Sequence, residues 1–326
     1  MPNDRPKVAL VTGANAGLGF AICQRLAESG NIKIVLTTRT HEKATKAIAS
    51  LPKLPDVTYE HVILDLGSMN SVVAAIRAIK SHYKHIDYFF MNAGYGTFTG
   101  MNFVTVAQQL LREGILPTFT QPRFKMQSTG DVSKDGMGAV FQTNVFGHWV
   151  MLQELVPQLQ PGGRAIWVSS IEALPHFLDI DDIQCYKSST AYESSKRLID
   201  LLHFASYADF KKVGVYTYVA HPGLCNTSIV NTALYPGFFT AWLAVAHFCR
   251  WLGSPWHTIT AYSGANFAKF LLQDNIDQDV KWGSGDDHGK GLIRTTPVVQ
   301  DEESGEKVYS TLQQMYKDWN SKNTSR

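Results

Sequence analysis

Short apolar runs alternate with segments of helical periodicity through most of the chain. The run at 8–11 precedes a segment at 18–29 whose apolar residues recur at helical spacing, and this order then repeats. Alternating strands and helices predict a parallel sheet with helices on both faces, doubly wound because its crossovers are right-handed. We therefore expect an α/β fold of the Rossmann type. The expected strands lie at 8–11, 33–37, 61–64, 86–91, 165–168 and 213–220, and the expected helices at 18–29, 41–49, 71–82, 141–159 and 191–208.

Two segments interrupt the alternation. Residues 95–139 are rich in Gly, Pro, Gln and Thr, and a loop of that length is functional or contains small helices of its own. Residues 237–256 are unusually apolar and have helical spacing, so we expect a C-terminal helical extension. The chain has 326 residues and no internal repeat, which fits a single domain over 1–326 with insertions.

The composition excludes several classes of protein. A net charge of +2, without a basic run, gives no reason to expect a nucleic-acid partner. The first residues are charged and lead directly into an apolar run, so no secretory signal is expected. The cysteines show no C-x-x-C spacing, and we expect reduced, buried thiols. They are Cys23, Cys185, Cys225 and Cys249.

The sequence TGANAGLG follows the first expected strand and precedes the first expected helix. A pyrophosphate binds backbone N–H groups at the positive end of a helix, and glycine allows the backbone to approach it. We therefore predict that Gly13, Gly17 and Gly19 lie close to a dinucleotide, with Asn15 and Leu18 in the same turn. The alternative is a tight strand-to-helix turn without a ligand.

The end of the second expected strand discriminates between NAD and NADP. An Asp or Glu there would bind the ribose 2′-hydroxyl of NAD, but this chain has Thr38, Arg39 and Thr40. The Arg39 guanidinium suits a 2′-phosphate, and the two hydroxyls add donors. The expected cofactor is NADP(H), although Arg39 on an ordinary surface is the alternative.

Tyr192 and Lys196 open the helix expected at 191–208. Residues four apart on a helix share a face, so the ammonium lies near the phenol and lowers its pKa. Tyr192 then becomes a candidate general acid for a carbonyl that receives a hydride. The motif Y-x-x-x-K is common by chance, and its position after the fifth strand of a dinucleotide fold gives it meaning.

The candidate catalytic set also includes one of two adjacent serines and an asparagine. Ser169 and Ser170 end the strand at 165–168, where ligands of open α/β sheets bind. A serine hydroxyl there can hold the substrate carbonyl beside Tyr192. Asn144, in the long expected helix, can anchor a water relay, or it can be an ordinary hydrogen-bonded core residue.

Together these motifs resemble the short-chain dehydrogenase/reductase family. The resemblance extends from the first strand to the P-G-x-x-x-T motif, and it adds an N-A-G turn after the fourth strand. It implies that the N-A-G turn supports the sheet beside the adenosine, that Asp65 binds the adenine side and that Thr227 contacts the nicotinamide carboxamide. The cofactor-binding residues implied in this way are Asp65, Asn92, Gly94, Tyr192, Lys196, Pro222, Gly223 and Thr227.

The resemblance also implies catalytic roles. Lys196 would hold the nicotinamide ribose, Asn144 would anchor a water in the proton path, and Ser170 is chosen over Ser169. The gap from this serine to Tyr192 exceeds the usual family spacing, so 174–190 should form a second insertion near the active-site mouth. The choice between the two serines remains open on sequence grounds.

A narrower resemblance is to the 3-keto-steroid reductases of sterol biosynthesis, the fungal ones in particular. It rests on FQTNVFGHW at 141–149, the insertion before it, and DIDDIQ at 179–184. It implies NADPH-dependent reduction of the 3-ketone left after C-4 demethylation, with a 4-methyl-3-ketosterol as substrate. One alternative is another lipophilic carbonyl, such as a retinal, a xenobiotic or a polyketide. Another is a dinucleotide-binding scaffold in a membrane complex with other sterol-synthesis enzymes.

The apolar segment 237–256 can be interpreted in two ways. Its length could span a bilayer, but His247, Arg250 and Pro255 disfavour that. An interfacial or sterol-facing helix, with Arg250 on its polar side, would place the protein on the cytosolic face of the endoplasmic reticulum or a lipid droplet. Packing on the protein's own core or in an oligomer is the alternative, with the cytosol as the alternative location.

Three histidines could suggest a metal site. His148, His221 and His247 lie on different expected elements, and none has a second ligand four residues away. We expect structural histidines and no metal.

Overall fold

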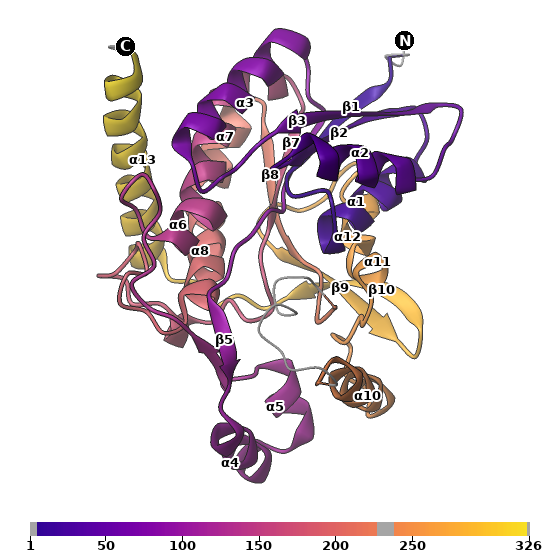
Figure 1. Cartoon of the computed structure of the whole chain (residues 1–326), viewed down its shortest axis with the longest axis vertical. Helices are drawn as coiled ribbons and strands as arrows, with labels where there is room; N and C mark the ends of the chain where they lie inside the picture. The colour runs from indigo at the N-terminus through magenta and orange to yellow at the C-terminus, as the bar shows by residue number, and fades with distance from the viewer. Residues whose placement is uncertain (1–4, 227–237, 325–326) are drawn as a thin grey trace.

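The computed structural model describes residues 5–226 and 238–324, and eight strands in this part of the chain form one sheet (Figure 1). They are β1 (Lys7–Val11), β2 (Ile32–Thr38), β3 (Val57–Ile63), β4 (Tyr88–Met91), β7 (Arg164–Val168), β8 (Tyr216–His221), β9 (Lys281–Asp287) and β10 (Lys290–Thr296). Their order is β10-β9-β8-β7-β4-β1-β2-β3. All neighbours are parallel except β10, which pairs with β9 in antiparallel register. The predicted α/β sheet is confirmed, and the β9–β10 edge is an addition that the sequence did not predict.

Helices cover both faces of this sheet (Figure 1). One face carries α1 (Gly17–Ala27), α2 (His41–Ser50), α11 (Ala261–Gly264) and α12 (Asn266–Phe270). The other carries α3 (Met69–His82), α6 (Ala139–Phe141), the π-helix η1 (Gln142–Phe146), α7 (Gly147–Leu159), α8 (Ala191–Lys212) and α13 (Glu302–Thr324). The doubly wound arrangement follows because consecutive crossovers change face where the strand order reverses at β1 and β4.

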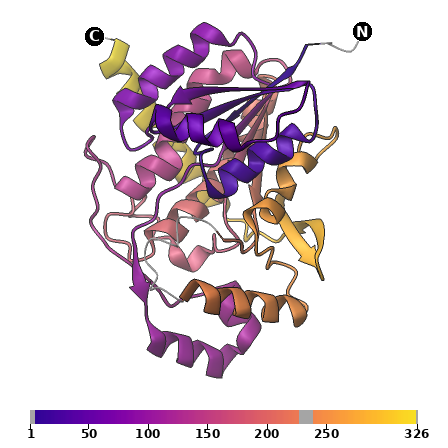
Figure 2. The same ribbon diagram turned by 45° about the vertical axis from the view of Figure 1, so that its right-hand side comes forward.

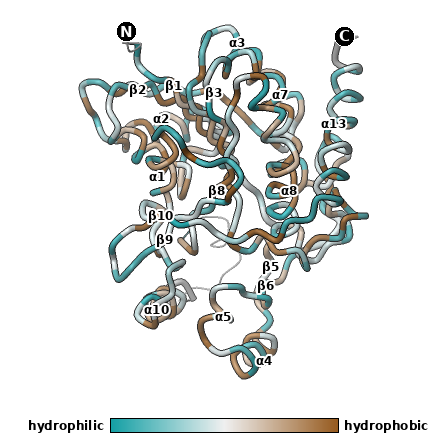
Figure 3. Tube along the Cα trace, turned by 180° about the vertical axis from the view of Figure 1, so that it is seen from behind, coloured by the Kyte–Doolittle hydropathy of each residue, from teal (hydrophilic) through white to brown (hydrophobic). Residues whose placement is uncertain are grey.

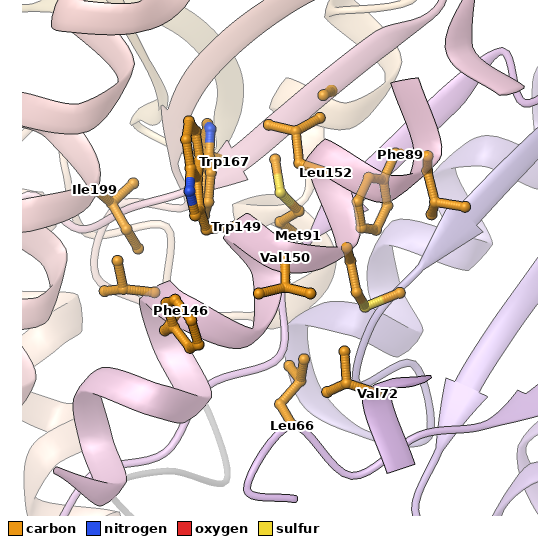
Figure 4. Close-up of a cluster of buried hydrophobic side chains, with 14 of the residues drawn as sticks. Leu66, Val72, Phe89, Met91, Phe146, Trp149, Val150, Leu152, Trp167 and Ile199 are labelled. Carbon is orange, nitrogen blue, oxygen red and sulfur yellow. The ribbon is translucent and has the colours of Figure 1, made fainter. Parts of the chain in front are cut away.

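The larger apolar core lies between the sheet and the second helical face. Figure 4 shows Trp149 and Val150 of α7 among side chains from the sheet and α3, including Val72 and Met91. Each fully buried apolar side chain of this size stabilises the fold by about 1.5–3 kcal/mol. The indole N–H of Trp149 donates to the Leu312 carbonyl at 3.1 Å, which attaches α13 to the same core.

The insertion at 95–139 has secondary structure of its own. It contains the antiparallel hairpin of β5 (Phe98–Met101) and β6 (Lys125–Gln127), together with α4 (Phe103–Glu113) and α5 (Ile115–Thr120). The prediction of small helices in this segment is therefore confirmed.

The segment at 174–190 contains a single 3-10 turn, η2 (Pro175–Phe177), and packs against the first insertion. The Tyr186 hydroxyl donates to the Gly136 carbonyl at 2.7 Å, and the Gly130 N–H donates to the Tyr186 carbonyl at 2.9 Å. The two insertions thus support each other through these hydrogen bonds.

Helix α10 (Phe238–Trp251) lies beside α5, at the end of the molecule opposite the two termini (Figures 1 and 2). The expected helix is present, but its faces differ from the sequence interpretation. Arg250 was expected on the polar face, whereas its guanidinium pairs with the buried Asp286 at 3.1 Å and donates to the His257 carbonyl. Among the described helices, none has both the length and the hydropathy needed to cross a bilayer.

Candidate active site

A cavity of about 500 Å³ opens at the carboxyl ends of the central strands, the place where open α/β sheets bind ligands. It brings together residues that are scattered through the sequence. The predicted residues that line it are Gly13, Asn15, Leu18, Gly19, Thr38, Arg39, Asp65, Asn92, Gly94, Tyr192, Lys196 and Pro222. Its lining extends from Arg39 at the end of β2, across the ends of β1 and β4, to Lys196 beside the end of β7. A dinucleotide binds across the ends of strands in this way.

Two glycines of the first turn are required by the protein itself. Gly13 has a φ of +66°, and a Cβ there would lie 3.0 Å from the Cα of Ala93. A Cβ on Gly19 would lie 2.3 Å from the Gly13 carbonyl oxygen and 2.5 Å from the Asn92 amide nitrogen. The glycine turn and the N-A-G turn therefore approach each other too closely for side chains. Gly17 begins α1 outside the cavity lining.

Thr12 links these two turns, and sequence analysis did not place it in the site. Its buried hydroxyl oxygen accepts from the backbone N–H groups of Asn92 and Ala93, at 2.8 and 2.9 Å. Asn92 returns a hydrogen bond from its amide to the Thr12 carbonyl, at 2.8 Å. The T-G motif carried a signal for this residue, because a hydroxyl beside the glycine can satisfy donors in the neighbouring loop.

His148 completes this buried network. Its Nε2 lies 2.9 Å from the Thr12 hydroxyl, and its Nδ1 lies 3.2 Å from the Asn144 carbonyl oxygen. Burial lowers the pKa of His148 to about 3, so the ring is neutral near pH 7. A neutral ring that donates from Nδ1 to the carbonyl accepts at Nε2 from the Thr12 hydroxyl. His148 is therefore a hydrogen-bonded core histidine, as the sequence predicted.

The three residues at the end of β2 have different environments. The Thr38 hydroxyl donates to the Thr40 carbonyl at 2.7 Å, so its proton is engaged within the protein. Thr40 caps α2 by accepting from the Lys43 N–H and lies outside the cavity lining. Arg39 is exposed and lines the cavity, which leaves it as the side chain best placed to meet a charged group there.

Residues of the insertion line the same cavity, and sequence analysis did not predict them there. Val132, Ser133 and Lys134 lie in its wall, together with Asp65. The Asp65 carboxylate accepts from the Gly67 N–H at 3.1 Å, which stabilises the turn after β3. The insertion therefore contributes to the cofactor groove as well as to the outer surface of the protein.

Tyr192 and Lys196 lie one turn apart on α8, as predicted. The Lys196 ammonium is 5.5 Å from the centre of the Tyr192 ring. It donates to the Val168 carbonyl at 2.7 Å, so the last residue of β7 fixes its position. Both side chains line the cavity, and the Lys196 residue is only 3% exposed.

The pKa of Tyr192 differs in direction from the sequence expectation. Burial raises it above its usual value, and the charge of Glu172 raises it further. Burial also lowers the pKa of Lys196 to about 8. Desolvation therefore outweighs the expected effect of the Lys196 cation on the phenol. The result is a phenol that keeps its proton, which is the form that a general acid requires.

The two serines after β7 have different partners. The Ser169 hydroxyl lines the cavity but donates to the buried Asp200 carboxylate at 2.6 Å. The Ser170 hydroxyl is outside the cavity lining and accepts from the Glu172 N–H at 3.1 Å. Accepting that bond leaves the Ser170 proton available, whereas the Ser169 proton is engaged. This chemistry favours Ser170 as the hydroxyl that can donate to a substrate.

Asn144 lies in the π-helix η1 and has a fully bonded amide. Its oxygen accepts from the Tyr95 N–H at 2.7 Å, and its nitrogen donates to the Tyr95 carbonyl and to the Ser195 hydroxyl, both at 2.9 Å. The side chain therefore ties the chain after β4 to helix α8. It lies outside the cavity lining, as does Gly223, while Thr227 falls outside the described residues.

Comparisons with known proteins agree with this geometry. The family described as short chain dehydrogenase matches residues 7–234. A 3-keto-steroid reductase of Kluyveromyces lactis is 36% identical over 97% of this chain and 95% of the relative. One from Schizosaccharomyces pombe is 35% identical over 97% of this chain and 98% of the relative. A solved 3-ketoacyl-(acyl-carrier-protein) reductase from Brucella melitensis, complexed with NADH, has a TM-score of 0.58 at 18% identity. It covers 85% of this chain and 96% of that structure.

Proposed function

This chain belongs to the short-chain dehydrogenase family and is an NAD(P)-dependent oxidoreductase, and from that premise we propose that it reduces a 3-ketosterol to the 3-hydroxysterol with NADPH. The substrate we propose is the 4-methyl-3-ketosterol left after C-4 demethylation in sterol biosynthesis. The observation that carries the proposal is similarity over nearly the whole chain to relatives named 3-keto-steroid reductase. The candidate acid Tyr192 and its neighbour Lys196 line the same groove as Arg39.

The chain's own residues account for the proton side of the reaction. Bound NADPH supplies the hydride that forms the new C–H bond. The Ser170 hydroxyl would hold the substrate carbonyl by donating to its oxygen. Tyr192, kept protonated by burial, gives its proton to that oxygen as the C=O double bond becomes a C–O single bond. The resulting phenolate lies beside the Lys196 ammonium, which stabilises its charge.

Arg39 supports NADPH as the preferred cofactor. It lines the groove at the end of β2, and its fork of N–H donors matches a 2′-phosphate. No carboxylate occupies this end of β2 to bind a free 2′-hydroxyl, since residues 38–40 are Thr, Arg and Thr.

An apolar end of the molecule supports attachment to a lipid surface. Helix α4 exposes Phe103, Val104 and Leu111, which is 87% exposed, and α10 exposes Phe248 and Trp251. These helices lie at the same end of the protein (Figures 1 and 2), and Figure 3 shows hydrophobic stretches along α4 and α5. A lipophilic ketone partitions into membranes, so we propose that this end contacts the cytosolic face of the endoplasmic reticulum or a lipid droplet. The alternative is that another sterol-synthesis enzyme, or a second copy of this chain, covers this apolar end.

The test of the reaction is an assay of the purified protein with a 4-methyl-3-ketosterol in detergent micelles. We expect NADPH oxidation that requires the sterol, is faster with NADPH than with NADH, and is lost in Tyr192→Phe. Loss of the phenolic acid should lower turnover by about 10²-fold or more. Activity on small ketones but not on the sterol would replace the substrate proposal with a general carbonyl reductase. Binding of NADPH without turnover of the sterol or of small ketones would favour the alternative of a dinucleotide-binding scaffold in a membrane complex.

A further inference from the structure

A buried cluster of charged side chains lies against Tyr192, and the mechanism above does not use it. Lys125 of β6 pairs with Glu172 at 2.6 Å and also with Glu193. The three side chains are 13%, 10% and 2% exposed. They come from the first insertion, from the segment after β7 and from the start of α8, so three separate stretches of chain meet at one ammonium.

The two glutamates flank the two candidate catalytic hydroxyls. Glu172 follows Ser170 by two residues, and its N–H donates to the Ser170 hydroxyl oxygen at 3.1 Å. Glu193 is the residue directly after Tyr192. Each carboxylate is therefore attached, through its own backbone, to a candidate catalytic residue or its hydrogen-bond partner. Since Lys125 contacts both, it connects the serine to the tyrosine through a charge-assisted hydrogen bond to Glu172 and an ion pair with Glu193.

The same strand holds the tyrosine in two further ways. The Gln127 amide oxygen accepts from the Tyr192 N–H at 2.9 Å, and its nitrogen donates to Glu193 at 2.6 Å. The ring of Phe98, on the paired strand β5, lies 5.3 Å from the Tyr192 ring. The hairpin of the insertion therefore forms one wall around the phenol.

The connection along the chain between Ser170 and Tyr192 is long and includes the segment 174–190. A long irregular connection constrains the relative position of its ends weakly, since its closure entropy depends only slowly on length. The bridge through Lys125 spans the same two residues in space. It supplies the constraint that a shorter connection would otherwise give.

We propose that Lys125 is a positioning residue, which fixes Ser170 relative to Tyr192 and balances the negative charge of Glu172 and Glu193 beside the phenol. The inference rests on the proposed catalytic roles of Ser170 and Tyr192. It assigns a function to the β5–β6 hairpin that the reaction alone does not require.

The charges that face Tyr192 come from several elements. The Lys125 ammonium lies 5.8 Å from the ring centre, on β6, and the Lys196 ammonium 5.5 Å from it, on α8. After burial, Glu172 raises the pKa of Tyr192, Lys125 lowers it, and Glu193 and Cys225 raise it. Removing the Lys125 cation should therefore raise the pKa of the phenol, and removing the Glu172 charge should lower it.

The reverse reaction reports this ionisation. Oxidation of a 3-hydroxysterol by NADP⁺ needs the phenolate, so its kcat/KM rises with pH as Tyr192 loses its proton. We expect Lys125→Met to move this rise to higher pH by about one unit or more, and Glu172→Gln to move it to lower pH. Lys125→Arg keeps the charge and should stay close to the wild-type profile. Lys80→Met, which breaks the distant Lys80–Glu154 pair, is the matched control.

A substrate-free readout separates this inference from the proposed function. The phenolate absorbance of the NADP⁺ complex, taken as the difference between the wild type and Tyr192→Phe, can be titrated without a sterol. Opposite displacements in Lys125→Met and Glu172→Gln would support the inference, even if the sterol is not turned over. If Lys125→Met does not fold, Lys125→Gln, which removes the charge but keeps a polar side chain, takes its place in both measurements.

The contrary results are equally distinct. Unchanged midpoints in both variants, in a protein whose activity still depends on Tyr192, would overturn the role of Lys125 and leave the proposed function intact. Displacement of both midpoints in the same direction would indicate general disturbance of the fold and would overturn it too. Full activity in Tyr192→Phe would overturn the catalytic assignment, and the inference with it.

Discussion

Lys281 and Asp200 form a buried ion pair behind the candidate active site. Their charged atoms are 2.6 Å apart, and the side chains are 3% and 1% exposed. Lys281 also donates to the Ser170 carbonyl at 2.7 Å, and Asp200 accepts from the Ser169 hydroxyl. The pair thus fixes both the backbone and a side chain at the end of β7.

Breaking this pair on one side should be costly for stability. We expect Lys281→Met to lower the free energy of unfolding by about 3–5 kcal/mol, because Asp200 would remain buried without its counter-charge. Urea denaturation measures the loss. The double variant Lys281→Met/Asp200→Leu should recover much of it, since no buried charge remains.

Lys212→Met is the control for that experiment. The Lys212–Asp209 pair is exposed at 75% and 50%, and removing it should cost about 1 kcal/mol or less. A Lys281→Met variant as stable as this control would show that the buried pair contributes nothing to the fold.

Single residues could be predicted where their chemistry is local. Gly13, Tyr192 and Lys196 stand in short motifs whose spacing places them on one turn or one helix face, and all three line the cavity. Lys125 and Lys281 could not be predicted in this way. Lys281 lies 111 residues from Ser170, and the pairing of β7 with β8 and of β8 with β9 brings the two together.

Secondary-structure elements could be predicted where burial imposes a clear pattern. The first strand was expected at 8–11 and is β1, one residue longer. The third strand was expected at 61–64, whereas β3 begins four residues earlier and spans Val57–Ile63. It forms the edge of the sheet, so its first half is partly exposed and polar and shows no apolar run. Strands β9 and β10 were missed for a related reason, because their sequences are rich in glycine and charged residues and contain no apolar run. Close packing explains why one of these glycines is needed. A Cβ on Gly283 would lie 2.3 Å from the His221 ring.

Helices α4 and α10 should determine binding to lipid vesicles. We expect Leu111→Ser and Trp251→Ser, combined, to weaken binding to sterol-containing phosphatidylcholine vesicles by about tenfold or more. Each large apolar side chain withdrawn from water contributes about 1.5–3 kcal/mol. Co-sedimentation measures the bound fraction.

Val299→Ser provides the matched control for vesicle binding. Val299 is 61% exposed and lies between β10 and α13, outside helices α4 and α10. Equal binding by the double variant, the control and the wild type would contradict a lipid-facing role for these two helices.

The groove and the apolar end belong to one molecule, in which the first insertion forms part of the wall of the site. Ligand that binds the folded chain stabilises it, by about 2.7 kcal/mol at a hundredfold excess over Kd. We expect NADP⁺ to raise the melting temperature more than the same concentration of NAD⁺ does, and we expect Arg39→Ala to remove that difference. Thermal unfolding followed by fluorescence measures both. Equal shifts by the two cofactors in the wild type would contradict the assignment of Arg39.

The partnership of Asp200 with Lys281 also bears on how the protein is made. The two residues are 81 positions apart, so a ribosome that has just added Asp200 must add 81 more residues before its buried counter-charge exists. Chains emerge from the amino end first, and their early parts begin to fold during synthesis. The glycine turn and the first strands can form early, whereas the serine end of β7 cannot reach its final form until β9 has emerged. A nascent chain would therefore be able to shape the part of its groove around the glycine turn well before the part beside the two serines.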